Sequence, residues 1–157
     1  MKPEISVVVP VYNEEEVIQT MHQRLTDVLS GLNLHYEIIY VDDGSKDNSA
    51  SIIRPWCTDD GRVKLLSFSR NFGHQTAITC GMDYAAGEAI VIIDADLQDP
   101  PELIPDMIAK WREGFEVVYA KRRKRSGETG FKKTTARLYY RLLHRLADVD
   151  IPTDVGD

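Results

Sequence analysis

The sequence predicts an α/β fold in which a mostly parallel sheet is flanked by helices. Short apolar runs rich in β-branched residues, typical of buried strands, alternate with longer segments whose apolar residues recur every three or four positions. Such strand–helix alternation is typical of layered α/β domains. Polar motifs follow three of the expected strands, at the edge where parallel sheets bind ligands.

The first half of the chain contains two strand–helix pairs. Residues 5–10 are a continuous β-branched run, and residues 14–32 carry apolar side chains along one helical face. Residues 36–41 form a second apolar strand. Residues 47–54 are expected to form a short helix that stops near Pro55, because proline disrupts a helix interior.

The alternation continues in the second half. Residues 63–68 and 89–93 are expected to be strands, separated by a helix at residues 73–86 that Gly87 closes as C-cap. Residues 101–113 follow as a helix with proline in its first turn. A fifth strand is then expected at residues 115–120.

The 157 residues fit one domain, and no linker or repeat divides them. No signal peptide is expected, and no apolar run approaches the roughly 18 residues of a membrane helix. Cys57 and Cys80 lack metal-site spacing, which favours reduced thiols in a cytoplasmic compartment.

The net charge of −6 conceals a basic segment at residues 121–145. This segment, an expected loop followed by an amphipathic helix at 131–146, holds ten lysines and arginines against Glu128 alone. Three interpretations stay open: solvated surface charge, phosphate binding by Arg122 or Arg123, and attachment to an anionic membrane surface. The acidic remainder of the chain disfavours a nucleic-acid partner.

A strand running into Asp94-Ala95-Asp96-Leu97-Gln98 is the strongest candidate site. On an extended segment, residues two apart point the same way, so Asp94, Asp96 and Gln98 would offer oxygens to one point. Oxygen ligands suit Mg²⁺ or Mn²⁺, which commonly accompany a phosphate-bearing substrate. Alone, the motif is more typical of an acidic turn after a buried strand, and the other motifs of the chain favour the cation site.

Two other strand ends carry polar motifs. Tyr12 offers a flat surface for a base and Glu14 a hydrogen-bond acceptor, whereas a structural interpretation makes Asn13 the N-cap of the next helix. Asp43, in Asp42-Asp43-Gly44-Ser45, is a carboxylate for a base or ribose, or part of a turn. His74, near a helix start, is not expected to be a catalyst.

Taken together, Val-Val-Pro-Val-Tyr-Asn-Glu from residue 8, Val-Asp-Asp-Gly-Ser from 41, Arg-Asn-Phe-Gly from 70 and Asp-Ala-Asp-Leu-Gln-Asp-Pro-Pro from 94 resemble the inverting glycosyltransferases of family 2. The branch that the chain resembles is that of polyprenyl-phosphate sugar transferases, such as bactoprenol glucosyltransferase and dolichol-phosphate mannose synthase. The resemblance implies a GT-A fold, a Rossmann-like α/β sandwich that binds nucleotide sugars.

The resemblance also assigns roles to residues. Those expected at the nucleoside are Pro10, Tyr12, Glu14, Val41 and Asp43. Those expected at the ribose and diphosphate are Asp94, Ala95 and Arg122. Those expected to bind Mg²⁺ or Mn²⁺ are Asp96 and Gln98. Asp157 matches the catalytic aspartate of the family's Thr-Gly-Asp motif, although Val155 replaces the usual threonine.

The activity implied is transfer of a hexose from a nucleoside diphosphate sugar, with UDP favoured, to a polyprenyl phosphate at the cytoplasmic face of the membrane. Residues 1–157 would then be one catalytic domain, cut short before the acceptor-binding residues and membrane helices, and weakly active or inactive. Homo-oligomerisation stays open. The alternatives are a phosphoacceptor receiver domain and a sugar-nucleotide-binding fragment without catalysis.

Overall fold

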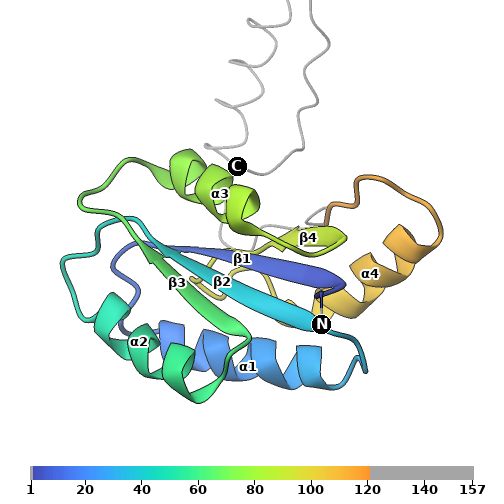
Figure 1. Ribbon diagram of the computed structural model, residues 1–157, viewed down its shortest axis with the longest axis horizontal. Coiled ribbons are helices and arrows are strands. Elements are labelled where there is room, and N and C mark those ends of the chain that lie inside the picture. The colour runs from blue at the N-terminus through green and yellow to red at the C-terminus, as the bar shows by residue number, and fades with distance from the viewer. Residues whose placement is uncertain (1, 121–157) are drawn as a thin grey trace, which may run out of the picture.

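A parallel four-stranded sheet in the order β3-β2-β1-β4 forms the centre of the computed structural model, which describes residues 2–120 (Figure 1). The strands are β1 (Ile5–Val11), β2 (Tyr36–Asp42), β3 (Val63–Ser67) and β4 (Ala89–Ile92). The helices are α1 (Ile18–Ser30), α2 (Ser49–Asp59), α3 (His74–Tyr84) and α4 (Ile104–Arg112), the last preceded by the 3-10 turn η1 (Pro101–Leu103). The α/β class predicted from the sequence is confirmed.

The two faces of the sheet are covered unequally among the described residues. Side chains alternate along β1, so that Ile5, Val7 and Val9 join the larger core beneath α1 and α2. Val8 faces α3 and belongs to a core of four buried residues with Ile39, Val41 and Ala77. Figure 1 shows α3 alone on this second face.

The strand order creates a crevice next to β1. The chain passes outward from β1 through β2 to β3, and then crosses to the other side of β1 to form β4. In open α/β sheets, such a change of direction leaves a crevice at the carboxyl ends of the strands, where ligands bind. Ligand-binding residues are therefore expected directly after β1 and β4.

Helix α1 begins four residues later than the sequence predicted, and Asn13 is not its N-cap. Asn13 has a positive φ of 58°, and Val17 precedes the helix without a side-chain cap. The expected cap is replaced by tertiary hydrogen bonds, because Asn13 Oδ1 accepts the N–H of Lys46 at 2.8 Å.

Helix α2 continues through Pro55 to Asp59, where the sequence predicted a stop. Packing beyond the proline accounts for the difference: Trp56 stacks on His22 of α1 with ring centroids 3.9 Å apart. The His22 Nδ1 lies 3.0 Å from the hydroxyl of buried Tyr40 on β2. This stack joins α1, α2 and the sheet and outweighs the hydrogen bond that proline cannot make.

Gly87 is not the C-cap of α3, which ends earlier, at Tyr84 with Ala85 as C-cap. A Cβ on Gly87 would lie 2.6 Å from the backbone nitrogen of Ser6, so this glycine allows close approach to β1. The Gly87 N–H donates to Ser6 Oγ, and that hydroxyl donates to buried Glu37 at 2.6 Å. Glu37 also accepts the Ala86 N–H and pairs with Lys64.

The expected fifth strand is not a strand in the structure. The N–H of Phe115 bonds to the carbonyl of Lys110, as at a helix end, and Val117 and Tyr119 are 80% and 72% exposed. Residues 115–120 were expected to form a fifth strand, but none of their side chains is buried within the described part of the chain. The expected helix at 131–146 lies outside the described residues.

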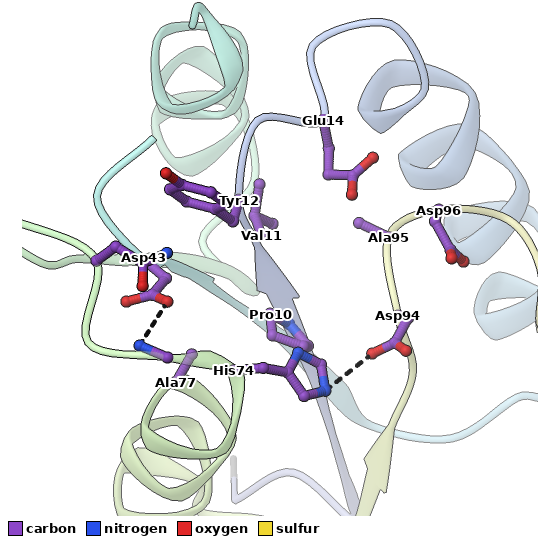
Figure 2. A pocket seen from close by; sticks show the side chains of 12 residues that line it. Pro10, Val11, Tyr12, Glu14, Asp43, His74, Ala77, Asp94, Ala95 and Asp96 are labelled. Atoms are coloured by element: carbon purple, nitrogen blue, oxygen red, sulfur yellow. Dashed lines mark hydrogen bonds and ion pairs between the residues drawn. The ribbon is translucent and has the colours of Figure 1, made fainter. Parts of the chain in front are cut away.

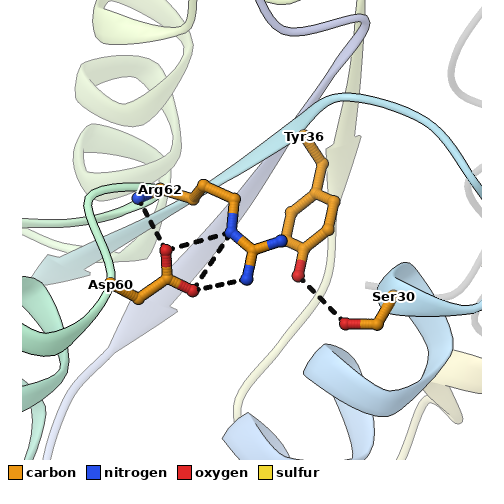
Figure 3. Close-up of polar contacts among 4 residues, drawn as sticks. All are labelled: Ser30, Tyr36, Asp60 and Arg62. Atoms are coloured by element: carbon orange, nitrogen blue, oxygen red, sulfur yellow. Dashed lines mark hydrogen bonds and ion pairs between the residues drawn. The ribbon is translucent and has the colours of Figure 1, made fainter.

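The opposite end of the sheet is held by polar contacts (Figure 3). The Arg62 guanidinium pairs with Asp60 at 2.8 Å and lies over the ring of Tyr36, 4.5 Å from its centroid. The Tyr36 hydroxyl lies 3.3 Å from Ser30 Oγ at the end of α1. These contacts connect α1, β2 and the α2–β3 turn far from the carboxyl ends of the strands.

Candidate functional site

A cavity of about 270 Å³ lies at the carboxyl ends of β1, β2 and β4 (Figure 2). Three strand ends and the start of α3 contribute its walls. The lining residues are Pro10, Val11, Tyr12, Glu14, Asp43, Asn71, Gly73, His74, Ala77, Asp94, Ala95 and Asp96. The cavity thus joins motifs that are distant in the sequence.

The turn after β1 is held by the loop after β2. The N–H of Asn13 donates to Ser45 Oγ at 3.0 Å, and that of Glu14 donates to Ser49 Oγ at 2.8 Å. These bonds fix the backbone directly after Tyr12, a residue that is 40% exposed. An aromatic surface is therefore presented on a constrained turn.

Asp43 holds the loop that leads into α3. Its carboxylate, 3% exposed, accepts the N–H of Phe72 at 2.7 Å and that of Gly73 at 2.9 Å. Gly44 has a φ of 70°, and a Cβ there would lie 2.4 Å from the backbone of Arg70. The β2 turn and the 70–73 loop are therefore packed backbone to backbone.

The segment after β4 is a turn, whereas the expected convergence of Asp94, Asp96 and Gln98 required an extended segment. Leu97 has a positive φ of 62°, and the Gln98 N–H donates to Asp96 Oδ1 at 2.9 Å. Asp96 and Asp94 line the cavity, while Gln98 is exposed and is not among the lining residues. The motif follows turn geometry because Asp96 bonds to its own backbone two residues on.

Acidic side chains meet at one side of the cavity. Burial raises the pKa of Glu14 above its ordinary value, and the negative charges of Asp96, Asp47 and Asp94 raise it further. Such an environment attracts a cation, because each carboxylate is costlier to ionise beside the others. These carboxylates come from the turns that follow β1, β2 and β4.

A divalent cation fits this chemistry if the substrate shares its coordination. Among residues 2–120, no three histidine, cysteine or acidic side chains are grouped closely enough to hold a metal ion by themselves. Mg²⁺ is commonly bound by one or two carboxylates together with substrate phosphates, and oxygen donors such as Asp96 suit it. The residues present therefore fit a metal bound jointly with a phosphate-bearing ligand.

Most of the sequence-predicted residues in the described part of the chain meet at this cavity. Those that line it are Pro10, Tyr12, Glu14, Asp43, Asp94, Ala95 and Asp96. Val41 is fully buried in the smaller core and does not line it. Arg122 and Asp157, with the basic segment, lie outside the described residues.

Sequence reasoning missed the contribution of α3. Asn71, Gly73, His74 and Ala77 line the cavity, and His74 Nε2 lies 3.5 Å from Asp94 Oδ1. The Arg-Asn-Phe-Gly motif was a signal for this wall. The position of this motif depends on its hydrogen bonds to Asp43, and no sequence pattern connects Asp43 with residues 70–73.

Comparison with protein families matches residues 6–157 to glycosyl transferase family 2. The chain belongs to this family. The alternative that the chain is a phosphoacceptor receiver domain is therefore wrong. The sheet order agrees, because β1 lies between β2 and β4, whereas receiver-like sheets place their first strand between the second and third.

Curated relatives cover nearly the whole chain. It is 62% identical over 152 residues to an uncharacterized glycosyltransferase, YkcC, of Bacillus subtilis, with 97% of this chain and 47% of the relative aligned. It is 43% identical to a prophage bactoprenol glucosyl transferase homolog of Escherichia coli, with 98% and 50% aligned. The family 2 chain therefore spans about half the length of these relatives.

Solved structures share the fold. Staphylococcus aureus TarS in complex with UDP-GlcNAc superposes with a TM-score of 0.62 at 26% identity, over 82% of this chain and 36% of that one. A Pyrobaculum calidifontis mannosyltransferase with GDP-Man and Mn²⁺ gives 0.60 at 23% identity, over 99% and 49%. The fold of this family 2 domain is of the GT-A type. No helix within residues 2–120 is long and apolar enough to span a bilayer.

Proposed function

We propose that this family 2 domain transfers a hexose from a nucleoside diphosphate sugar, with UDP favoured, to a polyprenyl phosphate. One observation carries the proposal: a single cavity at the carboxyl ends of β1, β2 and β4 collects an aromatic ring, a buried carboxylate and an acidic turn. The identity to a bactoprenol glucosyl transferase homolog supports the lipid acceptor, and the complex of TarS with UDP-GlcNAc supports the uridine donor.

The nucleoside is assigned to the β1 and β2 side of the cavity. The ring of Tyr12 would cover the base, because Tyr12 is exposed and the two residues after it are hydrogen-bonded to Ser45 and Ser49. Pro10 and Glu14 would lie beside it. Asp43 and Val41 are proposed to act through the backbone that they support, since both are buried.

The ribose and diphosphate are assigned to the turn after β4, at Asp94 and Ala95, with Arg122 binding the diphosphate. Asp96 and Gln98 are the residues proposed to hold Mg²⁺ or Mn²⁺. When bound, such an ion would stabilise the negative charge that builds up on the departing diphosphate. The acidic side chains around Glu14 support a cation at this place.

In the proposed reaction, an oxygen of the lipid phosphate bonds to the anomeric carbon from the face opposite the diphosphate. The bond between that carbon and the diphosphate oxygen breaks, the electron pair leaves with the nucleoside diphosphate, and the configuration inverts. A phosphate monoester with a second pKa of about 6 is largely ionised at neutral pH, so no strong base is required. Asp157 is proposed to orient the acceptor.

The basic segment at residues 121–145 is proposed to hold the domain against the anionic cytoplasmic face of the membrane, where a polyprenyl phosphate would be presented. Residues 1–157 are proposed to be a single catalytic domain.

A thermal-shift screen of UDP-, GDP- and CDP-sugars with Mn²⁺, followed by a transfer assay with polyprenyl phosphate, tests the proposal. Stabilisation by UDP-sugars and release of UDP that depends on the acceptor are expected. Donor binding without transfer would instead support a sugar-nucleotide-binding domain without catalysis. No stabilisation by any nucleotide sugar would contradict both functions.

A further inference from the structure

The contact between His74 and Asp94 spans the cavity from one wall to the other. His74 is the first residue of α3, and Asp94 follows β4, yet Nε2 and Oδ1 lie 3.5 Å apart. Figure 2 shows the pair beside Pro10, near the end of β1. Both side chains are about half exposed, at 52% and 43%, so the pair lies in the open cavity and not in the core.

The position of His74 is fixed from β2. Asp43 accepts the N–H groups of Phe72 and Gly73, which immediately precede His74. Gly73 has a φ of 101°, a conformation that turns the chain into α3 and that side chains other than glycine rarely adopt. The imidazole therefore reaches Asp94 from a backbone anchored on another strand.

We infer that His74 is a positioning residue that holds the Asp94 carboxylate toward the ribose of the nucleoside diphosphate sugar. This inference rests on the proposed function, which places the ribose at Asp94. A neighbouring side chain restricts the motion of a carboxylate on a turn. A nucleoside diphosphate sugar binds more tightly when the side chains that contact it are already held in place. His74 supplies such a restraint from a separate element.

The test measures the affinity of the protein for UDP and for 2′,3′-dideoxy-UDP, which lacks both ribose hydroxyls. The wild-type protein should prefer UDP by about tenfold or more, as expected for hydrogen bonds to a charged group. His74→Ala should reduce that preference to about threefold or less, because Asp94 is then less often in place. If His74 serves only the folding of the protein, His74→Ala should weaken the binding of both ligands equally.

A conservative variant and a control sharpen the experiment. His74→Gln keeps an amide N–H near the place of Nε2 and should recover most of the preference. Gln75→Ala alters the next residue of α3, which is exposed and does not line the cavity, and should change nothing. A double variant that combines His74→Ala with Asp94→Asn should show the same preference for UDP as Asp94→Asn alone, since the two residues act together.

The inference is overturned if His74→Ala retains the wild-type preference for UDP, or if the losses caused by His74→Ala and Asp94→Asn simply add. In both cases the wild-type protein still binds UDP, and the proposed function stands. A wild-type protein that binds no nucleoside diphosphate overturns the proposed function along with this inference.

Discussion

Asp43 illustrates how a residue can serve a site without facing it. The sequence motif predicted a carboxylate for the nucleoside, but both oxygens accept backbone N–H groups of the 70–73 loop. The side chain is almost entirely buried. Its effect on a ligand is therefore expected to pass through the loop and the start of α3.

Replacing Asp43 with asparagine should lower the free energy of unfolding by about 1–3 kcal/mol. The amide NH₂ would face one of the two N–H donors, which would leave that donor unpaired in a buried place. Chemical denaturation measures the change. Asp83→Asn, an exposed substitution on α3, is the matched control. Equal stability of the two variants would contradict a stabilising role for the hydrogen bonds that Asp43 accepts.

Replacing Asp96 with asparagine should remove the gain in UDP affinity that Mn²⁺ provides, a loss of about tenfold or more. The asparagine oxygen can still accept the Gln98 N–H, so the fold should be unaffected. Calorimetry with and without Mn²⁺ measures the effect, with exposed Asp106→Asn on α4 as control. An unchanged response to Mn²⁺ would remove Asp96 from the proposed metal site.

At the scale of elements, sequence reasoning succeeded where one pattern dominates. Strands β1 to β4 were predicted to within one residue at each end, because each is an apolar run with polar flanks. Local signals at Asn13, Pro55 and Gly87 misled, because tertiary contacts of the turn after β1, Trp56 and Ser6 decide the local conformation.

The candidate site was predictable to the same degree. The motifs after β1, β2 and β4 met at one edge because parallel strands share their direction. The Arg-Asn-Phe-Gly motif signalled the wall at Asn71 and His74 but not its position, which depends on the hydrogen bonds from Phe72 and Gly73 to Asp43. The extended geometry expected at Asp96 gave way to a turn.

Helix α2 tests how far tertiary packing compensates for the hydrogen bond that Pro55 cannot make. Pro55→Ala restores an N–H in the helix interior, and the proline ring is exposed, so little packing is lost. Unfolding free energy should rise by about 2 kcal/mol after allowance for the greater freedom of the unfolded chain. Pro105, in the first turn of α4, is the control, because alanine there should gain nothing. A Pro55→Ala variant that is no more stable would show that α2 bends around the ring.

At the scale of the whole molecule, stability should fall in two stages as the solution is acidified. Burial lowers the pKa of His22 below 6.5, although Asp60 opposes the shift. The unfolded chain therefore binds this proton more readily, and stability is lost as pH falls from 6.5 through the folded pKa. Glu14, whose pKa is raised, opposes this trend at lower pH.

The second stage involves Glu37. Burial raises its pKa, but hydrogen bonds from Lys64, Ser6 and Ala86 outweigh burial and leave the pKa below 4.5. Its contribution is present above pH 4.5 and is lost as pH falls through the folded pKa. Denaturation across pH 3 to 8, about the range both groups span, should show His22→Gln flattening the first stage and Glu37→Gln the second. Unaltered slopes in these variants would assign the acid sensitivity to other groups.

The slight core beneath α3 has a consequence for motion. Within residues 2–120, that helix buries Ala77 and Gly81, whereas α1 buries Ile18, Met21, Leu25 and Leu29. Segments with few buried apolar side chains open most readily, so amide hydrogens of α3 should exchange with solvent sooner than those of α1. A nucleotide resting on His74 would then complete the wall it touches, and its arrival should slow exchange in α3 while leaving α1 as it was.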